Sequence, residues 1–260
     1  MRLIERTIPH IATALLFAAL LWPARPALAD FTQNGPKLVG SVAGGSAQQG
    51  FSVALSADGH TAIVGGPTDI NNAGGGAAWV FTRTGEMWTQ QGNKLVGTGA
   101  VGTAVQQGRS VALSADGNTA IVGGPFDNSN TGSNTGAAWV FMRTDGVWTP
   151  QGDKLVGTGA VGAAEQGSSV ALSPDGKSAI VGGPADDSGV GAAWVFLRDQ
   201  VGGAWTQQGS KLVGTGAVES AQQGTSVGLS CNAAVVGGRG DDSHIGASWV
   251  FAAPLTGSDC

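Results

Sequence analysis

The sequence predicts an all-β domain built from four repeats, and three observations carry this prediction. The first glycine of a Gly-Gly pair stands at positions 65, 123, 182 and 237, so one unit recurs every 55 to 59 residues. Glycine makes up 45 of the 260 residues without the period of collagen, which is typical of tight turns between short strands. No sustained 3.6-residue periodicity of apolar residues follows residue 29, so strands rather than helices are expected to build the fold.

Residues 1–29 have the three parts of a signal peptide. Arg2 and Arg6 precede an apolar run over 11–22, and Ala27-Leu28-Ala29 supplies small residues around a cleavage point. The run is shorter than the ~20 apolar residues that a membrane span needs, and no later segment is similar. We therefore expect cleavage near Ala29, a secreted or periplasmic protein without a membrane span, and a single four-repeat domain over 30–260.

The charge balance argues against one class of partner. The chain carries 13 Lys+Arg and 18 Asp+Glu, a net charge of −5. Removal of residues 1–29 takes away Arg2, Arg6, Arg25 and Glu5, which leaves 10 basic and 17 acidic residues and a net charge of −7. We do not expect such an acidic domain to bind nucleic acid or an anionic membrane surface, because their phosphates attract basic proteins.

Each repeat predicts four short strands, and the second repeat shows them best. Residues 110–114 and 120–123 form two strands joined by Asp116-Gly117, a pair that favours the positive φ of a hairpin turn. The third strand, within 136–141, is apolar throughout, which indicates burial on both faces. The fourth runs from Trp148 toward Lys154 and contains Gly152, where a bulge or bend is expected.

The two ends of the repeat array predict ring closure. Residues 31–39 match the fourth strand, with Phe31 in the position that tryptophan holds elsewhere, and the chain stops soon after a third strand at 247–251. An open array would expose strand edges at both ends, whereas a ring pairs them. We expect a β-propeller of four four-stranded blades, closed by the N-terminal strand completing the last blade. A monomeric ring and an eight-blade ring shared by a dimer both fit this pattern.

The repeats resemble the FG-GAP repeat of the integrin α-subunit propeller and its bacterial relatives. The segments that match are Gln-Gly-Phe-Ser-Val at 49–53, Val-Gly-Gly-Pro at 64–67 and Gly-Ala-Ala-Trp-Val-Phe at 76–81. The resemblance covers nearly all of 31–252 and recurs four times. It implies a propeller fold and a role in recognition or cell adhesion. The family usually has seven blades, whereas this chain has four units.

The calcium loop of that family is reduced in this sequence. The family has an Asp-x-Asp-x-Asp-Gly run between the first two strands, where this chain has only Asp58, Asp116 or Asp175 before glycine. A Ca²⁺ site needs about 6–8 oxygen ligands, several of them carboxylates. We expect these aspartates to form turns and expect no cofactor, although the resemblance leaves Ca²⁺ binding open.

The loops between the second and third strands, here called the b–c loops, hold the candidate binding residues. They differ in length and sequence while the strands stay nearly constant, and loops on a rigid scaffold often carry function. On one face of a ring they would form a circle of carboxylates and amides for a ligand or a cation; the alternative is solvated loop tips without a function. The candidate residues are Asp69, Asn71, Asp127, Asn128, Asp186, Asp187, Asp241 and Asp242.

Two further motifs have a structural and a functional interpretation. Tryptophan recurs in the third strand, at 79, 139, 194 and 249, where an apolar context favours a place in the core over a sugar-binding platform. Arg239-Gly240-Asp241 spells the adhesion tripeptide that integrins recognise, but Arg239 simply replaces a proline of the other repeats, in a frame that already holds Gly and Asp. Whether this tripeptide is used stays open.

No constellation of catalytic residues is present in the sequence, so we expect a protein that is not an enzyme. Only His60 and His244 follow the signal peptide, and there is no nucleophile elbow and no P-loop. The favoured function is a secreted binding module that recognises a glycan, a surface protein or a matrix component through the b–c loops. The alternatives are a metal-assisted lyase or hydrolase and a self-associating structural protein.

The only two cysteines predict one disulfide. Cys231 lies in a shortened hairpin of the last repeat, and Cys260 ends a tail of nine residues after Phe251. The tail can span up to about 30 Å, and an exported protein meets oxidising conditions. We therefore expect a Cys231–Cys260 bond that fixes the C-terminus beside the last blade.

Overall fold

The structure is a computed structural model that describes residues 31–70, 75–102, 104–129, 133–199 and 203–252. Contacts divide the chain into Met1–Gln33 and Asn34–Cys260, and only the second unit is considered below. The predicted signal peptide and the predicted cleavage point lie outside the described residues.

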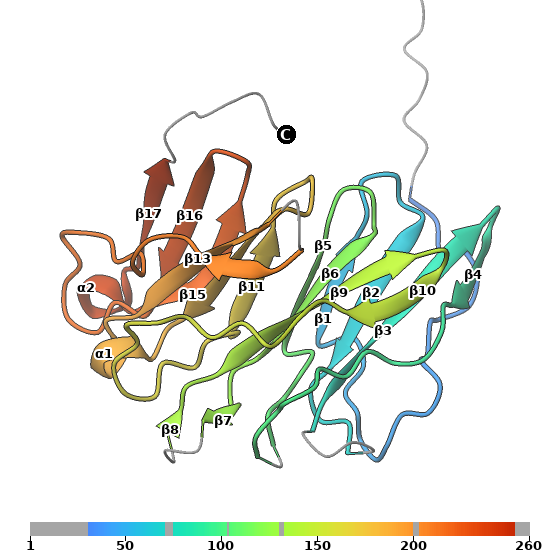
Figure 1. The fold of residues 1–260 in the computed structure, drawn as a ribbon, viewed down its shortest axis with the longest axis horizontal. Coiled ribbons are helices and arrows are strands. Elements are labelled where there is room, and N and C mark those ends of the chain that lie inside the picture. The colour runs from blue at the N-terminus through green and yellow to red at the C-terminus, as the bar shows by residue number, and fades with distance from the viewer. Residues whose placement is uncertain (1–30, 71–74, 103, 130–132, 200–202, 253–260) are drawn as a thin grey trace, which may run out of the picture. The chain divides into compact units, whose positions relative to one another are not determined.

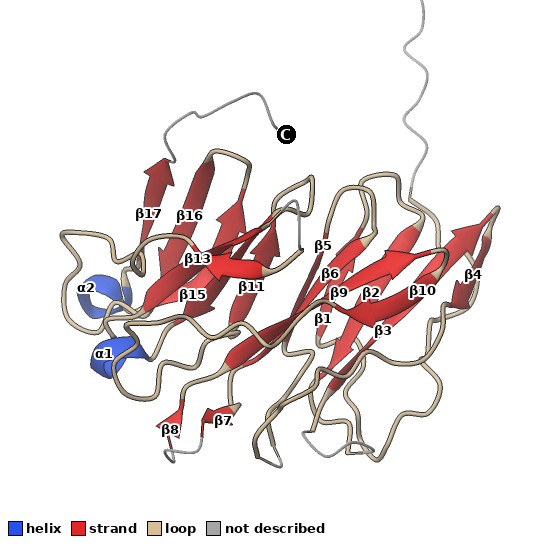
Figure 2. Ribbon diagram, in the orientation of Figure 1, coloured by secondary structure: helices blue, strands red, loops and turns tan. Residues whose placement is uncertain are grey.

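Four antiparallel sheets follow one another along the chain, and each corresponds to one predicted repeat (Figures 1 and 2). We call them blades 1 to 4. Blade 1 holds β1 (Ser52–Leu55), β2 (Thr61–Gly66), β3 (Ala77–Thr84) and β4 (Met87–Gln90). Blade 2 holds β5 (Ser110–Leu113), β6 (Thr119–Gly124), β9 (Ala137–Thr144) and β10 (Val147–Pro150). Blade 3 holds β11 (Ser169–Leu172), β12 (Ser178–Gly183), β13 (Ala192–Arg198) and β14 (Trp205–Gln207), and blade 4 holds β15 (Gln223–Leu229), β16 (Ala233–Gly238) and β17 (Ala247–Ala252).

The b–c loops carry the remaining short elements. In blade 2 the loop forms a small hairpin of β7 (Asn128–Ser129) and β8 (Ser133–Asn134). In blades 3 and 4 it contains the four-residue helices α1 (Asp186–Gly189) and α2 (Asp241–His244), which the apolar periodicity did not predict. Figure 1 shows β7, β8, α1 and α2 beside the same ends of their blades.

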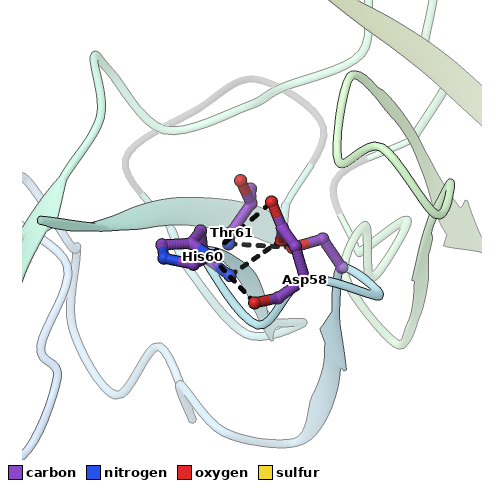
Figure 3. Close-up of polar contacts among 4 residues, drawn as sticks. Asp58, His60 and Thr61 are labelled. Carbon is purple, nitrogen blue, oxygen red and sulfur yellow. Dashed lines mark hydrogen bonds and ion pairs between the residues drawn. The ribbon is translucent and has the colours of Figure 1, made fainter.

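The Asp-Gly turns between the first two strands confirm their predicted role. In blade 1 the Asp58 Oδ1 accepts hydrogen bonds from the Ser56 hydroxyl at 2.5 Å and from the His60 amide at 2.9 Å (Figure 3). The Ser56 Oγ accepts the Thr61 amide at 2.9 Å, so the hydroxyl ties the two strands together. The following Gly59 has φ +67°, a conformation that glycine adopts without strain. The same bonds recur at Ser114–Asp116 and Ser173–Asp175.

The core lies between successive blades. One face of blade 1, with Ile63 and Val80, packs against Val111, Val122 and Trp139 of blade 2. The equivalent faces of blades 2 and 3, and of blades 3 and 4, form two further clusters. Trp79, Trp139 and Trp194 are at most 3% exposed, as the apolar third strands predict. The sheets are therefore packed as propeller blades.

The segment after the fourth strand links each blade to the next. Leu95 forms a bridge to Ala78 in its own blade, and two residues later Gly97 lies against the indole of Trp139 in blade 2. The side chain of Gln107 then holds Gly97, accepting its amide at 2.6 Å and donating to its carbonyl at 3.2 Å. The corresponding links are at Leu155–Gly157–Gln166 and Leu212–Gly214–Gln223.

The predicted ring closure is not seen among the described residues. Residues 34–39 form no strand, and the described part of blade 4 has three strands where four were expected. Gly40 lies against Trp79 and its amide donates to the Gln49 side chain, so the chain enters blade 1 through the same link that joins the other blades.

Candidate functional site

The first aspartate of each b–c loop is part of the scaffold. Asp69, Asp127, Asp186 and Asp241 are between 0 and 8% exposed. The Oδ1 of each accepts a backbone amide from the segment that enters its blade: Gly44 at 2.7 Å, Val101 at 2.8 Å, Val161 at 2.7 Å and Val218 at 2.6 Å. Four of the eight predicted binding residues therefore use their carboxylates to fix the loop to the blade.

A lysine completes this arrangement in the first three blades. Lys94, Lys154 and Lys211 stand at the start of the Lys-Leu-Val-Gly link, and their ammonium groups form ion pairs with Asp69, Asp127 and Asp186. Within the part of the chain that the structure describes, Asp241 in blade 4 has no ion-pair partner. These pairs were not predicted from the sequence, although the similar spacing of 25 to 27 residues between aspartate and lysine is a signal for them.

In blades 3 and 4 the second aspartate of the loop lies on the surface, in contrast to the buried first one. Asp187 and Asp242 are exposed, and their positive φ values of 49° and 46° turn the chain at the tips of α1 and α2. Asn128 lies in β7 opposite Asn134, and Asn71 lies outside the described residues. Of the predicted set, Asp187 and Asp242 are thus the carboxylates that a ligand can reach.

Two exposed isoleucines accompany these polar tips. Ile70 follows the buried Asp69 and is 71% exposed, and Ile245 follows α2 and is 80% exposed. His244 is also exposed and has φ +73°. In blade 4 an exposed isoleucine therefore shares the loop with the exposed Asp242, whereas the described part of the blade 1 loop presents Ile70 beside a buried aspartate.

The tripeptide Arg239-Gly240-Asp241 is held in the scaffold rather than at a loop tip. The carboxylate of Asp241 is 8% exposed and bonded to the Val218 amide, and Gly240 lies so close to Ser220 that an added Cβ would be 2.3 Å from its carbonyl oxygen. Arg239 is exposed and donates from Nε to the Gln222 side chain at 2.9 Å. A partner that reads the tripeptide would not reach its carboxylate.

The hairpin aspartates have lowered pKa values but form no ligand cluster. Hydrogen bonds from Ser56 and the His60 amide lower the pKa of Asp58. Burial acts to raise the pKa of Asp116 and of Asp175, but the hydrogen bonds from Ser114 and Ser173 and from neighbouring amides lower both below the ordinary value. Among the described residues no group of three or more His, Cys, Asp or Glu side chains is placed to hold a metal ion.

A hollow of about 430 Å³ is lined by residues of blades 2 and 3. Lys177 and Arg198 bring two positive charges to it, and Gln151, which also lines it, donates to the Gly203 carbonyl at 2.9 Å. Residues 200–202, next to this hollow in sequence, are outside the described residues. Met142 and Asp199 also line it.

Two other predictions concern the rest of the chain. No helix among the described residues is long and apolar enough to cross a membrane. Cys231 is not a free thiol, and its predicted partner Cys260 lies outside the described residues, so the pairing stays a prediction.

The fold defines the class of protein as a β-propeller repeat protein. No protein-family model matches the chain and no curated protein matches it. Solved structures that resemble it include a putative 6-phosphogluconolactonase from Bacteroides uniformis, with 14% identity over 78% of this chain and a TM-score of 0.46. Hydrazine synthase of Kuenenia stuttgartiensis has 15% identity over 84% of the chain and a TM-score of 0.46, and Saccharomyces cerevisiae Sqt1 has 15% over 61% and 0.41. The chain spans 55%, 49% and 34% of these three chains.

Proposed function

We propose that the protein is an exported, non-catalytic binding module that recognises a glycan, a surface protein or a matrix component through the tips of its b–c loops. The observation that supports this most directly is the contrast between a shared buried base and the exposed residues that follow it. The buried aspartate and its lysine serve the scaffold in the same way in three blades, whereas the exposed residue after the aspartate is Ile70 in blade 1 and an aspartate in blades 3 and 4. A rigid base with variable tips is the arrangement that binding loops use.

The chemistry of the tips narrows the class of ligand. Asp187 and Asp242 supply hydrogen-bond acceptors in blades 3 and 4, and Ile70 in blade 1 and Ile245 in blade 4 supply exposed apolar area. Hydroxyl groups of a glycan or amides of a protein can donate to such carboxylates, while an apolar patch covers a sugar face or a hydrophobic side chain. The net charge of −5 disfavours polyanions such as nucleic acid.

The enzyme alternative has less support from the geometry. Propeller enzymes need an acid, a base and a cation gathered in one sector, whereas the Asp–Lys pairs of this chain recur equally in three blades. Each carboxylate of these pairs is already bonded to a backbone amide, so it has little capacity left for a substrate.

Binding of the exported protein to a glycan array, with and without Ca²⁺, tests the proposal. The double variant Asp187→Asn/Asp242→Asn removes both exposed charges and keeps a residue that tolerates positive φ. We expect it to lose at least about tenfold in affinity for any glycan that the parent binds, a change of about 1.4 kcal/mol. Glu86→Ala, an exposed acid in the β3–β4 turn, is the matched control and should bind like the parent. Equal binding by the double variant and the control would contradict a role for the loop tips.

A further inference from the structure

The two ends of the blade array expose faces that are buried everywhere else. On β1, Val53 is 66% and Leu55 is 58% exposed, whereas their equivalents Val170 and Leu172 on β11 are 9% and 8% exposed. On the opposite face of blade 4, Val235 is 43% and Val250 is 71% exposed. Their equivalents in blade 2, which face blade 3, are Ile121 at 0% and Val140 at 3%. Each end is thus one half of a blade-to-blade interface without its other half.

The backbone shows the same complementarity. At each internal interface a glycine of the later blade enters the earlier one: Gly108 lies so close to blade 1 that an added Cβ would be 2.2 Å from the Ala77 carbonyl oxygen. The Ser52 hydroxyl donates to the carbonyl of Gly108 at 2.8 Å. Gly167 and Gly224 repeat this contact at the next two interfaces, with Ser110 and Ser169 as donors, each at 2.8 Å.

Both parts of a fourth contact of this kind are present but separate. Gly50 of blade 1 corresponds to Gly108, and nothing lies within 4 Å of a Cβ placed on it. In blade 4 a hollow of about 350 Å³ takes the place of the incoming glycine. It is lined by Ser226, Gly237, Gly238 and Ala247, which correspond to Ser52, Gly65, Gly66 and Ala77 in blade 1.

The ion pairs lead to the same conclusion from independent residues. Blades 1 to 3 each pair a loop aspartate with the lysine of the Lys-Leu-Val-Gly link. Blade 4 has the aspartate, Asp241, without a lysine, and the segment before blade 1 has the lysine, Lys37, without an aspartate among the described residues. Leu95, Leu155 and Leu212 each form a bridge to an alanine in the third strand of their blade. Leu38 has the same place before blade 1 but forms no such bridge among the described residues, and Ser248 is the equivalent of that alanine in blade 4.

We propose that a second copy of this chain occupies each end, so that blade 1 of one copy docks on blade 4 of the other and two chains form one ring of eight blades. The three internal interfaces use the same contacts, so they fix one rotation from blade to blade. After four blades at this rotation, the two end faces are still exposed. A second copy that forms the same contacts at both ends covers both faces, and Lys37, Leu38 and Gly50 of each copy then meet Asp241, Ser248 and Ser226 of the other.

The mass of the exported protein in solution tests this directly. Light scattering after size-exclusion chromatography should give twice the mass of one chain. The mass of a single chain would overturn the proposal, and so would a ladder of larger species, because an open head-to-tail polymer is not a closed pair.

Variants at the two ends identify the surfaces. Val250→Glu places a charge on the exposed face of blade 4, and Val53→Glu does so on blade 1; each should weaken dimerisation by at least about tenfold. Val147→Glu, at a valine that is 62% exposed on β10, is the control and should stay dimeric. Mixing Val250→Glu with Val53→Glu leaves one intact interface and should restore a one-to-one complex. No complex in the mixture would overturn the head-to-tail arrangement.

Substitution of a glycine separates docking from folding. Gly50 and Gly59 both have positive φ, +93° and +67°, and open space around an added Cβ, so alanine at either position strains the backbone of the single chain without a clash. Only Gly50→Ala places a methyl group where the partner's Ala247 carbonyl is expected. We expect Gly50→Ala to reduce dimerisation at least about tenfold relative to Gly59→Ala. Equal dimerisation by the two variants would overturn the proposed contact.

Discussion

Gln107, Gln166 and Gln223 are completely buried, and each holds the backbone of one glycine with both ends of its amide. These bonds attach the link between blades to the blade that follows. The sequence contains the glutamines in every repeat, but a Gln-Gly pair before a strand resembles any polar turn. Their role depends on a close approach of segments nine or ten residues apart, which no local pattern predicts.

Replacement of one buried glutamine should therefore destabilise the fold. Gln166→Leu leaves the Gly157 amide and carbonyl without partners, and we expect a loss of about 1–3 kcal/mol in the free energy of unfolding. Gln49→Leu removes the same two bonds at the half-buried first position, where water can replace them, and should cost clearly less. Urea denaturation of both variants measures the difference, and equal losses would contradict the role of burial.

The lowered pKa of a hairpin aspartate predicts that the stability of the protein depends on pH through this one side chain. The pKa of Asp116 is below its ordinary value of 3.8 in the folded chain, because the bonds from Ser114 and Asn118 outweigh the effect of burial. A lowered folded pKa stabilises the protein above the unfolded pKa, and this stabilisation is lost as the pH falls through the folded pKa.

Ser114→Ala removes one of these bonds, so the variant should lose less stability than the parent between pH 5 and about pH 2–3. Thermal melts across this range give the two slopes. Ser168→Ala is the control, because its hydroxyl donates to the Glu165 carbonyl and to no hairpin carboxylate. Parallel slopes for the parent and Ser114→Ala would contradict the assignment.

At the scale of elements, the first three strands of every repeat could be predicted and the loops could not. Asp-Gly turns and apolar third strands depend on neighbours in sequence, so the strands predicted over 110–114 and 120–123 correspond to β5 and β6 to within a residue at each end. The b–c loops depend on Lys94 and its equivalents, which lie a full strand pair away. The prediction that all eight loop residues face a ligand was therefore too broad: Asp69, Asp127, Asp186 and Asp241 are buried, and the described tips of blades 3 and 4 are exposed.

The shortened hairpin of blade 4 carries a prediction of its own. Leu229 pairs with Ala234 across a turn that holds Cys231, as the shorter sequence indicates. A bond to Cys260 would close a loop of about 30 residues and contribute roughly 3–4 kcal/mol. Peptide mapping of the unreduced protein should show this one cross-link, and Cys231→Ser should lower the melting temperature by as much as Cys231→Ser/Cys260→Ser. A free thiol at both positions in the exported protein would contradict it.

At the scale of the whole molecule, the feature that predicted the architecture was the order of the strands: a predicted fourth strand at 31–39 precedes the first repeat, and the last repeat has no fourth strand after 247–251. It predicted that the segment before blade 1 completes a last blade, and this part of the prediction is not shown: Gly40 and Gln49 form the usual link to blade 1, while residues 34–39 form no strand. Closure within one chain was not observed. The sequence could not decide this, because the rotation between blades follows from side-chain packing at three interfaces and not from the number of repeats.

Variants at two equivalent lysines, Lys94 and Lys37, distinguish the stability of the single chain from the stability that assembly adds. Lys94→Met leaves the carboxylate of Asp69 buried without its counter-ion, so it should destabilise the protein at every concentration, by up to about 3–5 kcal/mol. Lys37→Met removes an exposed lysine that has no ion-pair partner among the described residues of the same chain, so a dilute sample should melt as the parent does.

If Lys37 meets Asp241 of a second copy, the melting temperature of the parent rises with protein concentration, and Lys37→Met reduces this rise. Melts over a hundredfold range of concentration distinguish the two variants. Lys94→Met should be shifted downward with the slope of the parent, and Lys37→Met should have a smaller slope. A concentration-independent parent, or a Lys37→Met line parallel to the parent's, would show that Lys37 does not act between chains.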